Sequence, residues 1–265
     1  MSMILADSHC HIDFDDYAEG RAGVIAAARA VGVRYLLDVS VDVAHWERVL
    51  RVAADDLHIY ASVGVHPNEA HDPATEPDVE RLVAMAQRPK VVAIGETGLD
   101  YYRTPVEAAA GQQQRFRTHI RAARRIGKPL IIHTRAAAAD TLAVMAEEEA
   151  GQAGGVMHCF AESWAVAEAA LDMDFYISFS GIVTFKNALE LQEVARRVPL
   201  ERMLIETDSP FLAPVPYRGK VNQPAYVLEV ARKIAELRGI AVEEVAERTT
   251  QNFLELFKIP TQQAD

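Results

Sequence analysis

The sequence contains little cysteine and no long apolar run, and both shortages exclude classes of protein. Cys10 and Cys159 are the only cysteines among its 265 residues, which is too few for a framework of disulfide bonds and favours a reducing compartment. No apolar stretch reaches the ~20 residues that a membrane-spanning helix needs. The first residues also lack the basic start and apolar block of a secretion signal. We therefore expect a cytoplasmic protein that does not enter a membrane.

The sequence also lacks an excess of positive charge. Its net charge is -11, which disfavours nonspecific coating of nucleic acid, because that mode of binding needs a basic surface. An enzyme that acts on nucleic acid remains compatible with this charge if bound metal ions supply the positive potential. Half of the residues are hydrophobic, at 50%, and 25% are charged, so the chain can bury a substantial core.

Short apolar segments alternate with helix-like segments along almost the whole chain. Helix-like patterns occupy 21–30, 46–54, 79–86 and 106–126, a segment that ends near residue 150, and the C-terminus. This alternation predicts parallel βαβ units, and about eight of them in about 250 residues suit a (β/α)₈ TIM barrel of the α/β class. We expect one domain over 1–265. The strand-like segments are 3–6, 33–41, 58–65, 90–94, 129–132, 155–157, 174–179 and 203–205.

An open, doubly wound sheet is the alternative to the barrel. No glycine-rich dinucleotide fingerprint follows the first predicted strand, so this alternative lacks the motif that most often accompanies it.

Polar residues of metal-binding type follow the predicted strands. His9 and His11 end the first strand, and residues two apart in a strand point to the same face. The carboxyl ends of the strands of a closed barrel converge on one face. Each residue alone has an ordinary explanation, such as a hydrogen-bonded loop histidine or a carboxylate at a helix start. Their joint occurrence indicates a metal centre, and the expected ligands are His9, His11, Glu96, His133, His158 and Asp208.

Four histidines and two carboxylates exceed the ligands of one tetrahedral ion. We therefore expect two divalent ions bridged by Glu96, with Asp208 on the first ion beside the histidines of the first strand. Two such ions are a recurring device for hydrolysing phosphate esters with an activated water. Asp208 and Glu96 are the candidate catalytic residues, and Asp208 would orient the water or accept its proton. The donor set does not select among zinc, manganese and magnesium.

Candidate substrate-binding residues lie close to the same strand ends. Loops after the seventh and eighth strands of barrels often bind phosphate. Arg135 has the alternative of pairing with Asp140, and Tyr101, Tyr102 and Tyr217 could stack on bases or pack against the barrel rim. The substrate-binding candidates are His66, Arg103, Arg135, Arg218 and Lys220.

The cysteines and the remaining histidines have no expected part in the chemistry. Cys10 and Cys159 adjoin expected ligands but alternate away from them, so we expect packing and no nucleophilic cysteine. Four further histidines are expected to be structural or surface residues, namely His45, His58, His71 and His119.

Seven segments resemble those of the TatD family of metal-dependent deoxyribonucleases, in the same order. Three of them look like the signatures of that family, namely ADSHCHID at 6–13, PLIIHTR at 129–135 with Asp140, and LIETDSP at 204–210. Shorter matches are GVHP at 64–67, GETGLD at 95–100, HCF at 158–160 and RGKVN at 218–222. Small departures occur at Thr97, Phe211 and the pair Ala161-Glu162, where Ser-Gly is usual, and none removes a ligand. The last could reshape the loop beside the second metal, which leaves substrate preference open.

The resemblance implies a barrel hydrolase with two divalent metals bound by the same six residues. It also implies hydrolysis of DNA phosphodiesters, often from the 3′ end of single strands. Some relatives remove D-amino acids from tRNA, so a D-aminoacyl-tRNA deacylase is an alternative. A small-molecule amidohydrolase is another, although many of these bridge their metals with a modified lysine where Glu96 stands here. A metal-binding scaffold without catalysis is the third.

Overall fold

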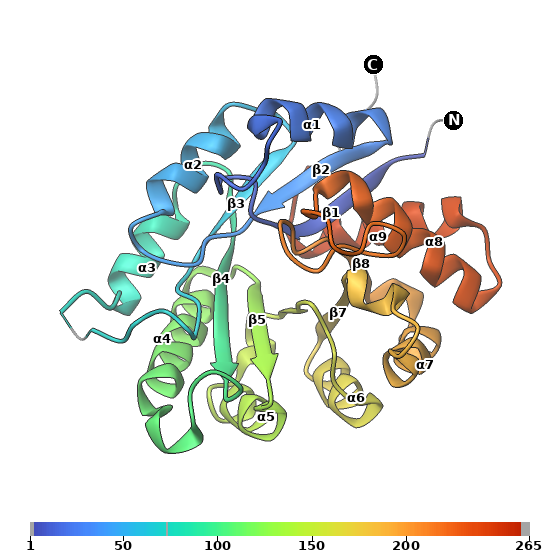
Figure 1. Ribbon diagram of the computed structural model, residues 1–265. Coiled ribbons are helices and arrows are strands. Elements are labelled where there is room, and N and C mark those ends of the chain that lie inside the picture. Colours follow the sequence, from blue (N-terminus) through green and yellow to red (C-terminus); the bar gives the residue numbers. More distant parts are fainter. Residues whose placement is uncertain (1–2, 73, 261–265) are drawn as a thin grey trace.

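The computed structural model describes residues 3–72 and 74–260, and its strands form one parallel, eight-stranded sheet in sequential order. Helices surround this sheet (Figure 1), so the expected (β/α)₈ barrel is confirmed. β4 and β5 run further than expected and include Glu96 and His133. The strands are β1 Leu5–Cys10, β2 Val33–Asp38, β3 Ile59–Val63, β4 Val91–Asp100, β5 Leu130–Arg135, β6 Gly155–Met157, β7 Phe175–Phe179 and β8 Met203–Ile205.

The helices follow the strands around the barrel. The helix expected over 106–126 is divided into a short 3₁₀ turn, η1 Val106–Ala108, and α4 Ala110–Ile126, which ends at Gly127 in the left-handed conformation. The other helices are α1 Gly20–Ala30, α2 Trp46–Ala54, α3 Val79–Ala86, α5 Ala138–Glu147, α6 Trp164–Asp172, α7 Leu189–Arg197, α8 Val227–Arg238 and α9 Val242–Leu256. Within the described ranges, every helix is too short or too polar to cross a bilayer.

Two apolar clusters form the core. Adjacent residues of β2 belong to different clusters: Leu36 packs in the larger one and Leu37 in the smaller one. This alternation is expected because successive strand side chains point to opposite faces of a sheet. Phe253 of α9 and Phe257, which follows that helix, also belong to the smaller cluster. Packing on both faces of the sheet gives the strand ends a fixed scaffold.

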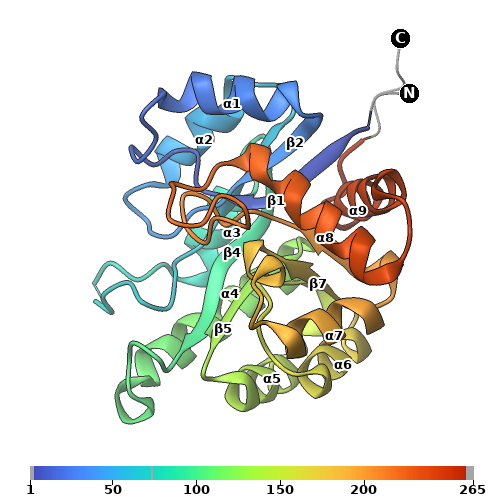
Figure 2. The ribbon, with the colours of Figure 1, turned by 45° about the vertical axis from the view of Figure 1, so that its right-hand side comes forward.

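The barrel closes between β8 and β1 through residues that follow β8. The Asp208 N–H donates to the His9 carbonyl at 2.9 Å, and the His11 N–H donates to the Ser209 carbonyl at 2.8 Å. The turned view (Figure 2) shows α8 and α9, the last helices, beside β1. The seam therefore brings the first and last polar segments of the chain together.

β1 and β4 each carry an irregularity at an expected metal ligand. Ile94 of β4 pairs with Leu130 of β5, and Thr97 pairs with Ile132. β4 therefore contains one residue more than β5 between these pairs. β1 shows the same mismatch against β2 between Asp7 and Cys10. Such bulges re-aim a side chain and are common beside active sites. Here they set the directions of Glu96 and His9.

Candidate metal centre

The six expected ligands lie together at the carboxyl ends of the strands, in two groups. In the first group, His9 Nε2 is 3.3 Å from His11 Nε2. Asp208 Oδ1 lies 3.7 Å from the former atom and 3.6 Å from the latter. Glu96 Oε2 reaches this group at 3.4 Å from His9 Nε2.

The second group gathers around the other oxygen of the same carboxylate. Glu96 Oε1 is 2.8 Å from His158 Nε2 and 3.0 Å from His133 Nδ1. The two ring nitrogens are 3.4 Å apart. Each oxygen of Glu96 thus faces a different group, which is the arrangement expected of a bridging carboxylate.

Hydrogen bonds fix which nitrogen of three histidines carries the proton. His11 Nδ1 lies 2.8 Å from the Val39 carbonyl, which can only accept, so Nδ1 donates. His158 Nδ1 lies 3.2 Å from Glu206 Oε1, and His133 Nε2 lies 3.3 Å from Asp100 Oδ2. In neutral imidazole the other nitrogen then offers a lone pair. Those lone pairs are on His11 Nε2, His158 Nε2 and His133 Nδ1, the atoms that face the two groups.

These donors fit divalent cations. Lone pairs and carboxylate oxygens that face one another at 2.8–3.7 Å repel unless positive charge lies between them. Atoms bound to one tetrahedral ion are separated by about 3.4 Å when each bond is about 2.1 Å. Imidazole and carboxylate together suit zinc, manganese and related ions. His9 Nδ1 is buried without a hydrogen-bond partner.

Positive charge on the surrounding imidazoles keeps both carboxylates ionised, a role that bound cations would take over where the rings are neutral. Burial raises the pKa of Glu96, but the nearby His158, His66 and His133 outweigh it and hold that pKa well below its usual range. Burial also raises the pKa of Asp208, yet its hydrogen bond to His11 and the neighbouring histidines bring the pKa below the ordinary value. The side chain of Asp208 is 15% exposed and that of Glu96 is 3% exposed, so Asp208 is the one that reaches solvent.

His66 differs from the other histidines of the site. Its Nδ1 accepts the Asn68 backbone N–H at 3.0 Å, so Nε2 carries the proton in the neutral ring. Nε2 lies 3.4 Å from Glu96 Oε1. His66 therefore presents an N–H donor to the site, in keeping with a substrate-binding residue.

The four candidate cations are exposed at the mouth of the barrel: Arg135 ends β5, and Arg103, Arg218 and Lys220 lie in loops. The Arg135 guanidinium lies 3.8 Å over the Tyr102 ring, and Asp140 accepts a hydrogen bond from the Tyr101 hydroxyl at 2.7 Å instead of pairing with Arg135. Arg218 lies 4.0 Å over the Phe185 ring. Among the residues that the structure describes, no carboxylate is within ion-pair distance of Arg103, Arg135, Arg218 or Lys220, so these cations remain available to a phosphate.

Two positioning residues were missed by the sequence analysis. Asp100 contacts His133 Nε2 and also accepts from Asn68 Nδ2 at 2.8 Å. Glu206 contacts His158 Nδ1 and accepts the Cys159 N–H at 2.8 Å. Carboxylates behind histidine ligands orient the ring and select its tautomer. Both residues lie within the segments that resemble the TatD family, close in sequence to an expected ligand. Their acidic side chains at those positions could have identified them from the sequence.

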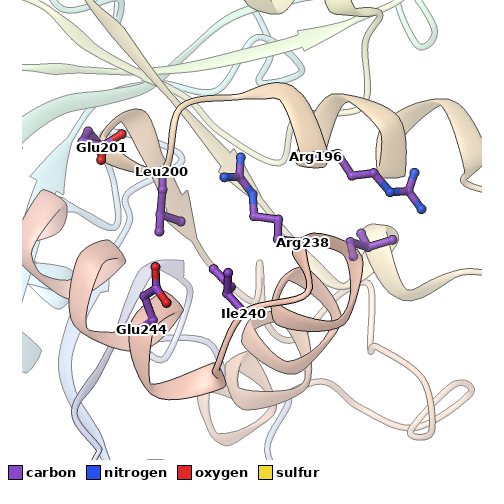
Figure 3. A pocket seen from close by; sticks show the side chains of 7 residues that line it. Arg196, Leu200, Glu201, Arg238, Ile240 and Glu244 are labelled. Atoms are coloured by element: carbon purple, nitrogen blue, oxygen red, sulfur yellow. The ribbon is translucent and has the colours of Figure 1, made fainter.

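A cavity of about 510 Å³ lies away from this centre, between α7, α8, α9 and the turn before β8 (Figure 3). Arg238 at its wall donates to the backbone carbonyls of Ala195 and Val198. The other polar lining residues in the figure are Arg196, Glu201 and Glu244. Among the described residues that line this cavity there is no histidine, so the histidine cluster is the stronger candidate site.

Comparison with known proteins agrees with this geometry. Residues 6–258 match the family model of TatD related DNase. The chain is 50% identical over 260 residues to YcfH of Escherichia coli K12, described as an uncharacterized metal-dependent hydrolase, with 97% of each chain covered. It is 31% identical to the 3′-5′ ssDNA/RNA exonuclease TatD of Salmonella typhimurium, over 96% of this chain and 98% of the relative.

A solved structure shows the same likeness in three dimensions. The crystal structure of YJJV, a TatD homologue from Escherichia coli K12, superposes with a TM-score of 0.90 at 28% identity and covers 98% of this chain and 100% of its own. This likeness agrees with the fold, with the cluster of histidines and carboxylates, and with the family match over nearly the whole chain. The protein belongs to the TatD family of metal-dependent hydrolases.

Proposed function

We propose that this protein is a deoxyribonuclease that removes nucleotides from the 3′ end of single-stranded DNA with two divalent metal ions. The observation that carries the proposal is the carboxylate of Glu96, whose two oxygens face two separate groups of lone-pair donors. The first ion is assigned to His9, His11 and Asp208, and the second to His133 and His158. A family relative named as a 3′-5′ ssDNA/RNA exonuclease supports the choice of substrate.

Different residues of the chain have different roles in the proposed hydrolysis. Divalent ions, when bound, lower the pKa of water and stabilise charge on the scissile phosphate. Asp208, the more exposed of the two carboxylates, is placed to orient a water molecule and accept its proton. His66 directs an N–H into the site and is placed to donate to a phosphate oxygen. Arg103, Arg135, Arg218 and Lys220 attract the phosphodiester backbone.

We place this activity in the cytoplasm. Both cysteines are free thiols, as a reducing compartment favours.

The test uses a 5′-labelled single-stranded oligonucleotide with magnesium or manganese and a chelator control. The wild-type protein is expected to give a metal-dependent ladder that shortens from the 3′ end. Asp208→Asn and Glu96→Gln are expected to lower kcat/KM by at least about a hundredfold, because several kcal/mol of metal-derived charge stabilisation are lost.

Asp174→Asn is the matched control. Asp174 and Asp208 both have a positive φ, at 69° and 56°, which asparagine tolerates, but Asp174 precedes β7 at the opposite end of the barrel. Its activity should equal the wild type. Full activity of the Asp208 and Glu96 variants would overturn the mechanism. No cleavage with any metal would overturn the nuclease assignment, and D-aminoacyl-tRNA would be tested next.

A further inference from the structure

Exposed large apolar side chains are concentrated at the mouth of the barrel. Eight such residues are exposed in the described part of the chain. Two of them, Ile4 and Leu57, precede β1 and β3 at the other end of the barrel. The other six follow the carboxyl ends of strands, namely Tyr102, Val106, Leu189, Phe211, Val215 and Val221.

Phe211 is the member of this set that adjoins the metal centre. Its ring is 52% exposed. The ring centroid lies 6.3 Å from that of His11 and 6.4 Å from that of Phe14, with both rings at steep angles to it. The Phe211 N–H donates to the Asp208 carbonyl at 2.9 Å. A backbone hydrogen bond thus joins this apolar residue to Asp208, which the proposed mechanism places beside the water.

The backbone of Phe211 is fixed although its ring is exposed. Asn222 is fully buried, and its Nδ2 donates to the Phe211 carbonyl at 2.6 Å and to the Thr207 carbonyl at 2.8 Å. Because the backbone is already fixed, only the side-chain torsions of Phe211 remain to be ordered when a ligand covers the ring, which favours binding.

Other aromatic rings at the mouth already have partners on their faces. Arg135 lies over Tyr102 and Arg218 over Phe185. Tyr217 stacks on Tyr226 at 3.8 Å between centroids and 2° between planes. Within the described residues no cation lies over Phe211, and its aromatic neighbours approach at an angle. Phe211 therefore combines a largely exposed ring with the absence, among the described residues, of a cation over it or an aromatic ring stacked parallel to it.

We propose that Phe211 stacks on one of the two nucleobases that flank the scissile phosphodiester. The proposal rests on the proposed function and adds to it a base-binding position on the side of His11 and Asp208. Every base offers a π face, so such a platform accepts any base. Within a duplex the penultimate base is covered on both faces by neighbouring base pairs and the terminal base on one face, so the platform favours an unpaired 3′ end.

The test varies the base and the ring together. Three manganese-activated assays compare an intact single-stranded oligonucleotide with two others that carry an abasic tetrahydrofuran nucleotide at the 3′-terminal or the penultimate position. For the wild type, kcat/KM should fall about tenfold or more on one of the abasic substrates. Phe211→Leu should lose a similar factor on the intact substrate and cleave the intact and abasic substrates equally well.

Two further variants separate stacking from general damage. Phe211→Tyr keeps the ring and should keep the dependence on the base. Leu57→Ala removes a 69% exposed apolar side chain at the opposite end of the barrel and should behave as the wild type. Equal cleavage of intact and abasic substrates by the wild type, or an unchanged ratio in Phe211→Leu, would overturn the stacking alone. No cleavage of any substrate by the wild type would overturn the proposed function and the stacking with it.

Discussion

At the scale of single residues, the hydrogen-bond partner of one histidine ring nitrogen decides whether the other nitrogen carries a proton or a lone pair. His133 and His66 both lie beside Glu96 Oε1, at 3.0 Å and 3.4 Å. Asp100 accepts a hydrogen bond from His133 Nε2–H, so the proton stays on Nε2 and Nδ1 keeps a lone pair for a metal. The Asn68 N–H occupies Nδ1 of His66 and leaves Nε2 with a proton. Two histidines at the same carboxylate therefore have opposite roles.

Asp100→Asn is expected to lower the affinity for the second metal ion, which the proposal assigns to His133 and His158. The Tyr102 and Arg103 backbone N–H groups donate to Asp100 Oδ1 at 3.0 Å each, so the amide oxygen must stay there and the amide NH₂ must face His133 Nε2. His133 would then move its proton to Nδ1 and lose the lone pair. We expect metal affinity to fall about 10- to 100-fold, measured by calorimetric titration with manganese or zinc.

Asp140→Asn is the control for this change. Asp140 also accepts a side-chain hydrogen bond at the mouth, from the Tyr101 hydroxyl, but it contacts no expected ligand. Its metal affinity should match the wild type. An unchanged affinity in Asp100→Asn, with an unchanged circular dichroism spectrum, would rule out tautomer selection by Asp100.

At the scale of elements, the bulge in β4 depends on a glycine. Gly95 has φ +146°, and a Cβ there would lie 2.6 Å from the Ile131 carbonyl oxygen and 2.8 Å from the Ile131 Cβ. Glycine alone combines this backbone with such close approach of β5. The position of Glu96 between the two ligand groups follows from that contact.

Gly95→Ala is expected to damage both stability and metal binding. Backbone strain and overpacking together should lower the free energy of unfolding by about 2–4 kcal/mol, and β4 should move away from β5 and carry Glu96 with it. Urea unfolding and metal titration measure the two effects. Gly127→Ala at the end of α4 is the control, because φ is +65° there but the added Cβ meets open space. It should cost about 1 kcal/mol and leave metal affinity unchanged; equal effects of the two changes would contradict this account.

At the scale of the whole molecule, acid stability depends on a buried histidine that joins α4 to the β3 loop. His119 is fully buried; its Nδ1 donates to the Arg115 carbonyl at 2.8 Å, and its Nε2 accepts the Val65 N–H at 3.1 Å. Burial lowers the pKa of His119 to about 4 from an ordinary value of 6.5. Both nitrogens are used in the neutral form, so protonation breaks the contact to the loop that leads to His66.

The pH dependence of unfolding follows from this depressed pKa. The unfolded chain binds the proton below about pH 6.5 and the folded chain only below about pH 4, so the contribution is complete above pH 6.5 and is lost as the pH falls to 4. The loss is about 3 kcal/mol. His119→Gln cannot titrate, so its free energy of unfolding should fall less over this window. Urea unfolding of metal-free protein from pH 7 to 4 measures the difference, and parallel curves for the two proteins would refute the assignment.

The sequence by itself determined the barrel and predicted which residues gather in the candidate metal centre. Apolar strands alternate with helices along the chain, and parallel strands of a closed barrel must present their carboxyl ends at one face. Once His9, Glu96, His133 and Asp208 each follow or end a strand, their convergence requires no detail of packing. The recognised segments pointed to the same residues.

Only the tertiary structure decided how each of these residues can act. The hydrogen bonds that set the tautomers of His133 and His158 come from Asp100 and Glu206, which are 33 and 48 positions away in sequence. The bulge at Gly95 depends on the approach of β5, and the exposure of the Phe211 ring depends on where the side chains of other loops come to lie. Strand periodicity is a local property of the chain, whereas these contacts join segments that become neighbours only when the barrel closes.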